Sequence, residues 1–591
     1  MALVLFHTSK VRQALKAPAS LGVDAVLLVG LAGLVAALAV IFGQATAPVA
    51  RQVRIDLSLW ALPRYTLLSL GRGFAAYLLS LLFTLVYGTV AAHNPTAEKT
   101  MLPALDILQS IPVLGFLPGV VLAMIHLFPT RQIGLELACV IMIFTAQAWN
   151  MTFSFHGSLR SIPTALREAA ALQGLGGWQI FRLLEVPAAM IGLVWNSMMS
   201  MAGGWFFLMV NEAFQLKING ENRDFRLPGI GSYMSEAVTQ HNRLAQVGAV
   251  VAMILMIIIV DQVFWRPIVV WSQRFKLEDS SDADVPHSWM MDLFKHSWLL
   301  NLLRRWLGRR RTQPSIPAVR RSGPRRPLIT PAVKRIATWL VMAVLAAFAA
   351  WGAVKLLILL IHLPIRDLTP GKPLTEREDW IAVLLALLAS FARTTAAVVL
   401  GAAWTLPVGI LIGLAPRWSH RLQPVTQVLA SFPAPMLFPL VYEALVWMHI
   451  PFGIGCAALM LLGSQWYILF NVVAGASTIP AELKEAGAVY RMSAPQRWRR
   501  LYIPSVFPYL VTGLITAAGG AWNATIVSEA LLGTDVRTFG LGSMIGQTYD
   551  SGRYSLLAAA VVTMSLFVVL LNRVVWKRLY RLAESRYSLN A

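Results

Sequence analysis

The chain has 591 residues, of which 57% are hydrophobic and 13% charged, and its mean hydropathy is +0.63. A soluble protein of this length needs far more polar surface, so the composition excludes a soluble globular class and indicates a polytopic membrane protein. The formal net charge of +22 is spread among the apolar runs instead of lying in one soluble domain, which argues against nucleic-acid binding.

Twelve apolar runs follow one another along the chain. Each is long enough to cross the hydrocarbon core of a bilayer, and because unpaired backbone groups are costly in lipid, each is predicted to be a helix. The first run shows no signal-peptide pattern with a cleavage site and is expected to be retained. The runs lie at 22–43, 66–92, 103–127, 133–155, 187–212 and 244–271, and then at 336–362, 382–413, 423–447, 452–476, 504–530 and 555–576.

A charged segment occurs twice between these runs, at 161–187 and 478–504, and its matched residues are 317 positions apart. Small insertions change this offset elsewhere, but the correspondence extends along most of the chain. The matched residues are Ile162-Pro163 with Ile479-Pro480, Glu168-Ala169 with Glu485-Ala486, Pro187 with Pro504, Arg72 with Arg393, Gly88 with Gly409, Ser110-Ile111-Pro112 with Ser431-Phe432-Pro433, Gly203-Gly204-Trp205 with Gly520-Ala521-Trp522, Glu212 with Glu529, and Gly229-Ile230-Gly231-Ser232 with Gly540-Leu541-Gly542-Ser543.

Two homologous halves of six spans each explain this repeat. The sequence therefore predicts an all-α fold with a first repeat at 1–271, a linker at 272–335 and a second repeat at 336–591. An even number of spans gives both halves the same orientation, so we expect a pseudo-two-fold axis along the membrane normal.

Basic residues set the predicted orientation. The linker carries arginine clusters such as Arg309 to Arg311, and the C-terminal tail holds Lys577 and Arg578. Because Lys and Arg concentrate in cytoplasmic loops, the linker, both termini and both charged segments are expected in the cytoplasm. Within the linker, residues 287–311 mix Trp, Leu and Phe with Arg, and form either an amphipathic helix in the membrane interface or a spacer whose charge fixes the topology.

The charged segment resembles the EAA motif of permease subunits of ATP-binding cassette importers. In that family the motif is Glu-Ala-Ala, a Gly a few residues later, and then an apolar residue followed by Pro. The first copy fits this pattern, and the second is degenerate because an arginine stands where Gly is expected. The matching residues are Glu168, Ala169, Ala170, Gly174 and Pro187 in the first copy, and Glu485, Ala486, Gly487, Arg491 and Pro504 in the second.

Features around the motif are similar to those of the nitrate/sulfonate/taurine-type branch of these permeases. They are the Arg before the second span of each half, the Ser-Ile-Pro or Ser-Phe-Pro at the third, and the Gly-x-Trp followed by Glu on the fifth. The resemblance implies two tandem six-helix type I importer permease repeats in a bacterial inner membrane. Relatives of this branch carry small oxyanions such as nitrate, sulfonates or bicarbonate, so the resemblance implies an anionic solute.

The resemblance also implies partners. Helices near 164–180 and 481–497 are expected to couple the chain to two cytoplasmic ATP-binding cassette ATPase subunits, and a solute-binding protein is expected outside. The chain itself has no G-x-x-x-x-G-K-[S/T] loop, H-E-x-x-H motif or nucleophile elbow. We therefore expect no catalytic residue, metal site or cofactor in this chain, and ATP with Mg²⁺ to be bound by the ATPase partner.

An ordinary cytoplasmic loop helix is the alternative interpretation of the charged segments. Under the coupling interpretation, small residues let a short helix approach a partner closely, and Arg167 and Glu168 form salt bridges at its edge. Pro187 and Pro504 are expected to break the helix where the chain re-enters the membrane. Arg491 predicts unequal coupling, because a bulky cation replaces the Gly of the first copy.

Ionisable residues within spans are candidates for the solute path, because they are expensive in lipid. Glu212 and Glu529, near the outer ends of the fifth spans, either form an external gate or pair with Arg72 and Arg393 within their own halves. Trp205 and Trp522 either line the path or pack the bundle. Cys139 and Cys456 lie inside apolar runs and are predicted to be core residues.

The two halves differ outside the membrane. The loop at 213–228 is six residues longer than its counterpart, and it is either a contact for the binding protein or an ordinary solvated loop.

An ion-coupled secondary transporter is the main alternative, since twelve spans in two parallel halves suit that class as well. Such a transporter is expected to bury a titratable relay, yet only Asp106 and Glu443 lie near span centres, and the paired EAA segments stay unexplained. A membrane sensor or scaffold is a third interpretation, distinguished by whether solute moves.

Overall fold

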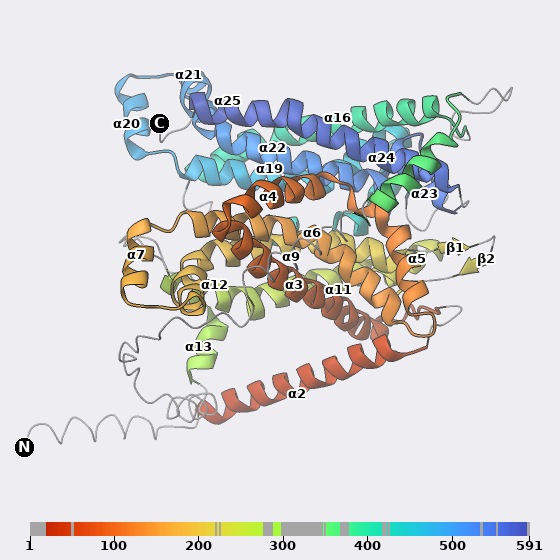
Figure 1. The fold of residues 1–591 in the computed structure, drawn as a ribbon, viewed down its shortest axis with the longest axis horizontal. Helices are drawn as coiled ribbons and strands as arrows, with labels where there is room; N and C mark the ends of the chain where they lie inside the picture. The colour runs from red at the N-terminus through yellow and green to blue at the C-terminus, as the bar shows by residue number, and fades with distance from the viewer. Residues whose placement is uncertain are drawn as a thin grey trace, which may run out of the picture. The chain divides into compact units, whose positions relative to one another are not determined.

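The computed structural model describes residues 19–48, 53–214, 216–218, 221–223, 226–275, 288–296, 347, 350–366, 377–415, 422, 426–531, 536–550 and 553–587 (Figure 1). These residues fall into two compact units. The first unit contains 19–44, 154–196 and the described residues of 258–345, and the second contains the remainder. Most of the predicted amphipathic segment at 287–311 lies outside the described residues.

The first unit contains most of α2, Ala19–Thr46, together with the first charged segment. The C-terminal end of α6 (Ile133–Arg160) and the start of α9 (Val186–Ala213) also belong to it. Its other elements are α7 (Thr164–Leu172), α8 (Gly177–Ile180), the π-helical turn η3 (Phe181–Glu185), the π-helical η4 (Val260–Trp265), α12 (Arg266–Ser272), the 3-10 turn η5 (Gln273–Phe275) and α13 (Trp289–His296).

The second unit contains the remaining elements of the first half and the described elements of the second half. From the first half come η1 (Leu59–Ala61), α3 (Leu62–His93), α4 (Pro95–Ser110), η2 (Val113–Phe116), α5 (Leu117–Leu127), most of α6 (Ile133–Arg160), most of α9 (Val186–Ala213), β1 (Leu216–Ile218), β2 (Glu221–Arg223), α10 (Ile230–Thr239) and most of α11 (Arg243–Ile259). From the second half come α16 (Trp380–Leu414), η7 (Ala434–Met436), α18 (Phe438–Trp447), α19 (Phe452–Ser477), α20 (Ala481–Val489), α21 (Ala494–Arg497), the π-helical η8 (Trp498–Tyr502), α22 (Ile503–Ser528), α23 (Leu541–Asp550), α24 (Tyr554–Leu571), the π-helical η9 (Asn572–Trp576) and α25 (Lys577–Tyr587).

In the part of the chain that the structure describes, nine helical stretches are long and apolar enough to cross a membrane. They match the predicted runs except in three places. The runs predicted at 103–127 and 423–447 are not continuous helices, and only Ala350–Ile361 of the run at 336–362 is described as an apolar helix. The nine stretches are Leu28–Thr46, Leu59–His93, Ile133–Arg160, Gly177–Ala213, Arg243–Phe275, Trp380–Leu414, Phe452–Ser477, Ala494–Ser528 and Tyr554–Ala583.

The third span of each half is interrupted at a proline. In the first half α4 ends at Ser110, and Ile111 takes an extended conformation (φ −82°, ψ 129°) before Pro112. A proline disfavours helical geometry in the residue before it, so Ile111-Pro112 stops the helix and η2 starts a new one. Pro433 precedes η7 in the same way in the second half. The sequence prediction of one continuous helix in each place is wrong, because hydropathy does not register such a break.

Pro187 and Pro504 do not break their helices. Each lies in the first turn of a long helix, α9 or α22, and each follows a single π-helical turn, η3 or η8. A π-helical turn moves the backbone hydrogen bonds to wider spacing, which accommodates a residue that lacks an N–H and whose ring crowds the preceding turn. The helices are therefore continuous from Gly177 to Ala213 and from Ala494 to Ser528, and the predicted break is wrong.

The all-α prediction is confirmed, and one short hairpin is the strand pair among the described residues. Strands β1 and β2 pair antiparallel, with Leu216 opposite Arg223 and Ile218 opposite Glu221. The hairpin falls in the loop at 213–228 that the sequence marks as longer than its counterpart. This extension of the first half thus has its own regular structure, and β1 packs near α23 of the second half.

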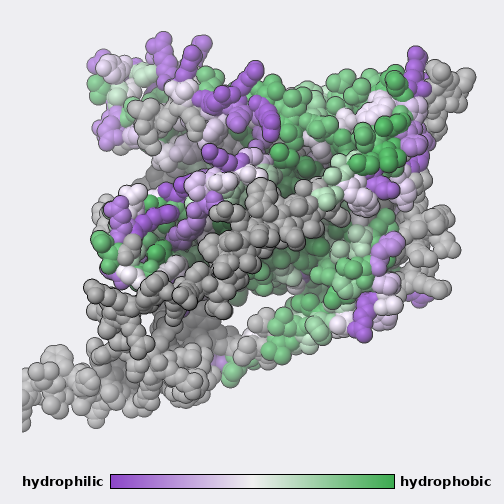
Figure 2. Space-filling view, viewed as in Figure 1, coloured by the Kyte–Doolittle hydropathy of each residue, from purple (hydrophilic) through white to green (hydrophobic). Residues whose placement is uncertain are grey.

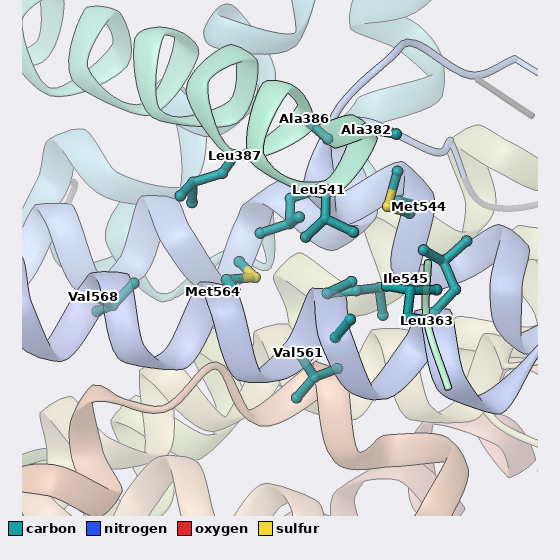
Figure 3. Packing of buried hydrophobic residues seen from close by; sticks show 14 of the residues in the cluster. Leu363, Ala382, Ala386, Leu387, Leu541, Met544, Ile545, Val561, Met564 and Val568 are labelled. Atoms are coloured by element: carbon teal, nitrogen blue, oxygen red, sulfur yellow. The ribbon is translucent and has the colours of Figure 1, made fainter. Parts of the chain in front are cut away.

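Buried apolar side chains join α16, α23 and α24 (Figure 3). Leu387, Leu541, Ile545 and Met564 belong to this cluster, and each is almost fully buried. The outer faces of the long helices show the opposite pattern, because apolar side chains such as Leu411 are exposed there. Figure 2 shows apolar side chains over α16 and α24, with hydrophilic side chains gathered near helix ends. Exposed apolar faces of this length fit helices surrounded by lipid.

Candidate functional site

The two charged segments have the same internal structure. In the first copy Glu168 is exposed on α7 and Ala170 is buried, and in the second copy Glu485 is exposed on α20 and Gly487 is buried. Each helix is followed by a turn and then by a four-residue helix, α8 or α21. The small residues at the buried positions let each helix pack closely against its own loop.

Both helices end with the same backbone turn. Gly174 has φ +69° and Arg491 has φ +47°, both in the left-handed region. The N–H of Leu175 donates to the carbonyl oxygen of Ala170 at 3.2 Å, and the N–H of Met492 donates to that of Gly487 at 3.0 Å. This is the hydrogen-bond pattern of a helix C-terminus that closes on a left-handed residue. The second copy therefore keeps the turn although an arginine replaces the glycine.

The turn that follows is also capped in the same way. The backbone N–H of Gly176 donates to Oε1 of Gln179 at 2.8 Å, and that of Ser493 donates to Oε1 of Gln496 at 2.9 Å. These four residues are related by the 317-residue offset, so α8 and α21 begin at equivalent places.

One exposed apolar residue stands at the same place in both copies. Leu172 is 89% exposed at the end of α7, and Val489 is 78% exposed at the end of α20. Each comes two residues before the left-handed turn. The sequence prediction missed this pair, although the repeat alignment shows an apolar residue at the last helical position of both copies. Nearby, Trp178 and Tyr490 are also largely exposed.

A buried ion-pair cluster joins the second and fifth spans of the first half. Nη1 of Arg72 lies 2.6 Å from Oε1 of Glu212, and the hydroxyl of Ser69 donates to the same carboxylate at 2.7 Å. The N–H of Gly231 donates to Oε2 of Glu212 at 2.9 Å, and the N–H of Ile230 donates to the Ser69 hydroxyl at 2.9 Å. The carboxylate thus accepts from the N-terminus of α10 and fixes that helix in place.

An equivalent cluster is present in the second half. Nη1 of Arg393 lies 2.9 Å from Oε1 of Glu529, and the hydroxyl of Ser390 donates to that carboxylate at 2.7 Å. The N–H of Gly542 donates to Oε2 of Glu529 at 2.9 Å, and that of Leu541 donates to Ser390 at 2.8 Å. The repeat therefore preserves a complete hydrogen-bonding arrangement, from which α23 starts as α10 does.

Glycines at the start of α10 and α23 make this arrangement possible. A Cβ atom on Gly229 or Gly540 would collide with the carboxylate of Glu212 or Glu529. A Cβ on Gly231 would collide with the carbonyl oxygen of Met209. The Gly-x-Gly-Ser pattern that the sequence shows twice is thus explained by close backbone approach to a buried carboxylate.

The two clusters differ in one partner. In the first half Glu136 binds Arg72 through two oxygens, at 2.6 Å to Nε and 2.8 Å to Nη2. In the second half Nε of Arg393 donates instead to the backbone carbonyl oxygen of Gly453 at 2.7 Å. The first cluster therefore carries two carboxylates for one guanidinium, and the second carries one. Sequence reasoning missed Glu136, whose match at the 317-residue offset is a glycine.

These contacts decide between the two structural expectations for the fifth-span glutamates. Glu212 and Glu529 have no solvent exposure, and each is paired with the arginine of its own half. This geometry is the one that the ion-pair expectation describes. Trp205 is almost fully buried against Gly73, and Trp522 is buried with its ring centroid 5.8 Å from that of Phe567. Both tryptophans pack the bundle.

The remaining candidates lie at exposed positions or in the core. Asp106 is exposed on α4, and exposed Glu443 lies 3.5 Å from Nη2 of Arg243. Cys139 and Cys456 are buried and unbridged, so the prediction that they are core residues is confirmed. Among the described residues, no group of His, Cys, Asp and Glu has the arrangement of a metal site.

Tandem six-span halves with matching charged segments and matching ion-pair clusters define a duplicated membrane transport component. The chain belongs to the family of binding-protein-dependent transport system inner membrane components, which matches residues 84–264 and again 405–588. Each half therefore contains one copy of the family's domain. This membership favours the importer interpretation over an ion-coupled secondary transporter.

Curated relatives of the chain are transport permeases. It is 28% identical over 193 residues to the nitrate import permease protein of Leptolyngbya laminosa, covering 32% of this chain and 64% of that one. It is 30% identical over 187 residues to the bicarbonate transport system permease protein of Synechocystis sp., again 32% of this chain and 64% of the relative. A putative aliphatic sulfonates permease of Bacillus subtilis is 26% identical over 203 residues, 32% of this chain and 70% of the relative. The chain thus matches slightly less than two thirds of the length of the first two relatives.

Proposed function

We propose that this chain is the fused membrane permease of an ATP-binding cassette importer for a small oxyanion. The observation that carries this proposal is the pair of charged segments with the same helix, the same left-handed turn and the same exposed apolar tip. A single exposed leucine or valine is ordinary, but its repetition at the same position of both copies favours a surface that a partner covers. A separate subunit that covers this position in each half explains why both apolar residues are exposed in the isolated chain.

The coupling surfaces consist of the exposed tips of α7 and α20. Leu172 and Val489 present apolar contact area, and Glu168 and Glu485 stand exposed on the same helices for charged contacts at the edge. Two tips suit two ATPase subunits, one for each half, which would bind ATP and Mg²⁺ in the cytoplasm. Both termini would then be cytoplasmic as well.

The two surfaces differ in charge. The first segment, 161–187, carries two arginines and two glutamates, and the second, 478–504, carries five basic residues and two glutamates. The first surface is therefore close to neutral, and the second carries a net positive charge. This difference supports unequal coupling through the two tips.

The solute is proposed from the relatives. Their names specify nitrate, bicarbonate and aliphatic sulfonates, which are all small oxyanions. A solute-binding protein would deliver the anion at the side of the hairpin β1–β2, the extension that only the first half carries.

A pull-down tests the coupling surfaces. The tagged chain is purified in mild detergent from its own cells, and the co-purifying protein is identified by its nucleotide-binding sequence. Leu172→Asp and Val489→Asp each place a carboxylate in an apolar contact and are expected to lower ATPase recovery at least tenfold. Ala165→Asp, exposed at the start of α7, is the matched control and is expected to leave recovery unchanged. A well-folded wild-type chain that recovers no ATPase would refute the proposal.

A further inference from the structure

The two halves meet in the second compact unit through their fifth spans. Oδ1 of Asn523 on α22 accepts a hydrogen bond from the N–H of Val113 at 3.1 Å, in the interrupted third span of the first half. Phe206 of α9 packs against Gly463 and a buried cluster of the second half that includes Ala524. Phe206 and Asn523 are 317 residues apart, so equivalent positions cross to the opposite half.

These two contacts identify the face of α22 and the face of α9 that point to the opposite half. Thr512, Thr516, Gly519 and Asn523 follow helical spacing on α22, so they share the face that Asn523 directs at the first half. Thr512 is exposed, Thr516 is half-buried, and the space beside Gly519 is open. A face turned to lipid would be apolar, as it is elsewhere on these helices. This face is therefore polar and open, with the threonine hydroxyls donating to carbonyl oxygens of their own helix.

The opposing face on α9 is apolar. Met199 is 44% exposed and lies two helical turns before Phe206, on the face that points to the second half. Its match on α22 at the 317-residue offset is Thr516. The two walls are thus unlike, with hydroxyl and amide groups on one side and methionine and phenylalanine on the other.

Tyr467 lies between these walls. Its ring is 3.1 Å from the place where a Cβ on Gly520 would stand, and its hydroxyl is 3.7 Å from the place of a Cβ on Gly203 in the first half. No described residue hydrogen-bonds to this hydroxyl, although the backbone carbonyl of Tyr467 accepts from Asn471. The repeat partner of Tyr467 is Asn150, which has no ring to place at the same position.

We propose that the Tyr467 hydroxyl, beside the α22 face of Thr516 and Asn523, is a contact site for the small oxyanion on a path between α9 and α22. This inference rests on the proposed importer function and adds the residues that meet the solute. Tyr467 donates a hydrogen bond to the anion as it passes Gly203 and Gly520. The side chains of this site are neutral, and a path must bind an ion weakly enough to release it. A neutral donor meets that requirement, whereas a lysine or arginine would hold the anion.

Uptake by the reconstituted complex tests this site. The chain, the ATPase recovered with it and its binding protein are placed in liposomes, and ATP-dependent uptake of nitrate, bicarbonate and taurine is measured. Tyr467→Phe removes only the hydroxyl and is expected to lower the uptake rate at saturating binding protein about tenfold, with ATPase binding unchanged. Tyr509→Phe is the matched control, because that ring packs on Gly475 away from the path, and its uptake is expected to stay at the wild-type rate.

A second variant obstructs the path itself. Gly203→Leu places a side chain against the Tyr467 hydroxyl and is expected to abolish uptake while the ATPase still co-purifies. Wild-type uptake together with unchanged rates in Tyr467→Phe and Gly203→Leu would overturn the proposed contact site and leave the importer function standing. Absence of ATP-dependent uptake of every anion by the wild-type complex would instead overturn the proposed function.

Discussion

Arg491 shows how one residue can depart from a motif without changing the fold. It occupies the left-handed turn that Gly174 occupies in the first copy, with φ +47° against +69°. A side chain in this conformation brings Cβ close to a carbonyl oxygen, and glycine avoids that contact. The second copy therefore accepts backbone strain at this position, and its exposed guanidinium is the chemical feature that distinguishes it.

Relieving this strain is expected to stabilise the protein. Arg491→Gly should raise the free energy of unfolding by about 1 kcal/mol, and Gly174→Arg should lower it by a similar amount. Thermal unfolding of the detergent-purified chain measures both changes. Ser493→Gly, two residues on at an extended position, serves as the control and should not stabilise. A destabilised Arg491→Gly variant would show that the guanidinium makes a compensating contact.

The ion-pair clusters are expected to respond unequally to loss of their arginines. Arg72→Met leaves the carboxylates of Glu136 and Glu212 without their cation, and Arg393→Met leaves only that of Glu529. Leaving a buried charge unpaired costs about 3–5 kcal/mol, so both variants should lose stability and Arg72→Met should lose more. The midpoint of thermal unfolding and the yield of folded protein show which of the two variants loses more stability.

A second change separates charge from packing in this comparison. Glu212→Gln removes one uncompensated carboxylate and should restore part of the stability of Arg72→Met. Arg243→Met disrupts an exposed pair and should cost under about 1 kcal/mol. Equal losses in Arg72→Met and Arg393→Met would mean that the second carboxylate of the first cluster, that of Glu136, does not affect stability.

At the scale of helices, sequence reasoning succeeded where the signal is long and repeated. Apolar runs predicted most spans, and an ion pair of Arg72 with Glu212 was one of the two expectations for that glutamate. It failed at the interruptions, since Pro112 ends a helix and Pro187 does not. The difference arises from the π-helical turn η3, a feature of backbone hydrogen bonding that hydropathy does not report.

The candidate site, like the helices, could be predicted only in part from the sequence. The EAA resemblance singled out both charged segments, but the exposed tips Leu172 and Val489 became clear only when the helix ends were known. Tyr467 gave no signal in the sequence. It was singled out by its position between α9 and α22, and these two helices lie far apart in the chain.

For the whole molecule, contacts between the halves indicate an assembly that does not depend on the linker. In the second unit α4 packs against α24, Gly115 meets Val561, and Asn523 binds Val113. Two separately expressed fragments, divided within residues 312–331, are therefore expected to co-purify and to retain ATP-dependent uptake. Size-exclusion chromatography with only one fragment tagged measures this. Recovery of the tagged fragment alone would show that the covalent connection is needed.

The position of Tyr467 carries a consequence for how this chain arose. In a symmetric dimer of two identical subunits, every side chain near the axis occurs twice, and two tyrosine rings would compete for the room between one pair of glycines. Here the first half has Asn150 at the matching place, so a single ring occupies that room. Joining the halves in one polypeptide lets each copy diverge alone, so one half can supply a ring between Gly203 and Gly520 that a symmetric dimer would have to supply twice.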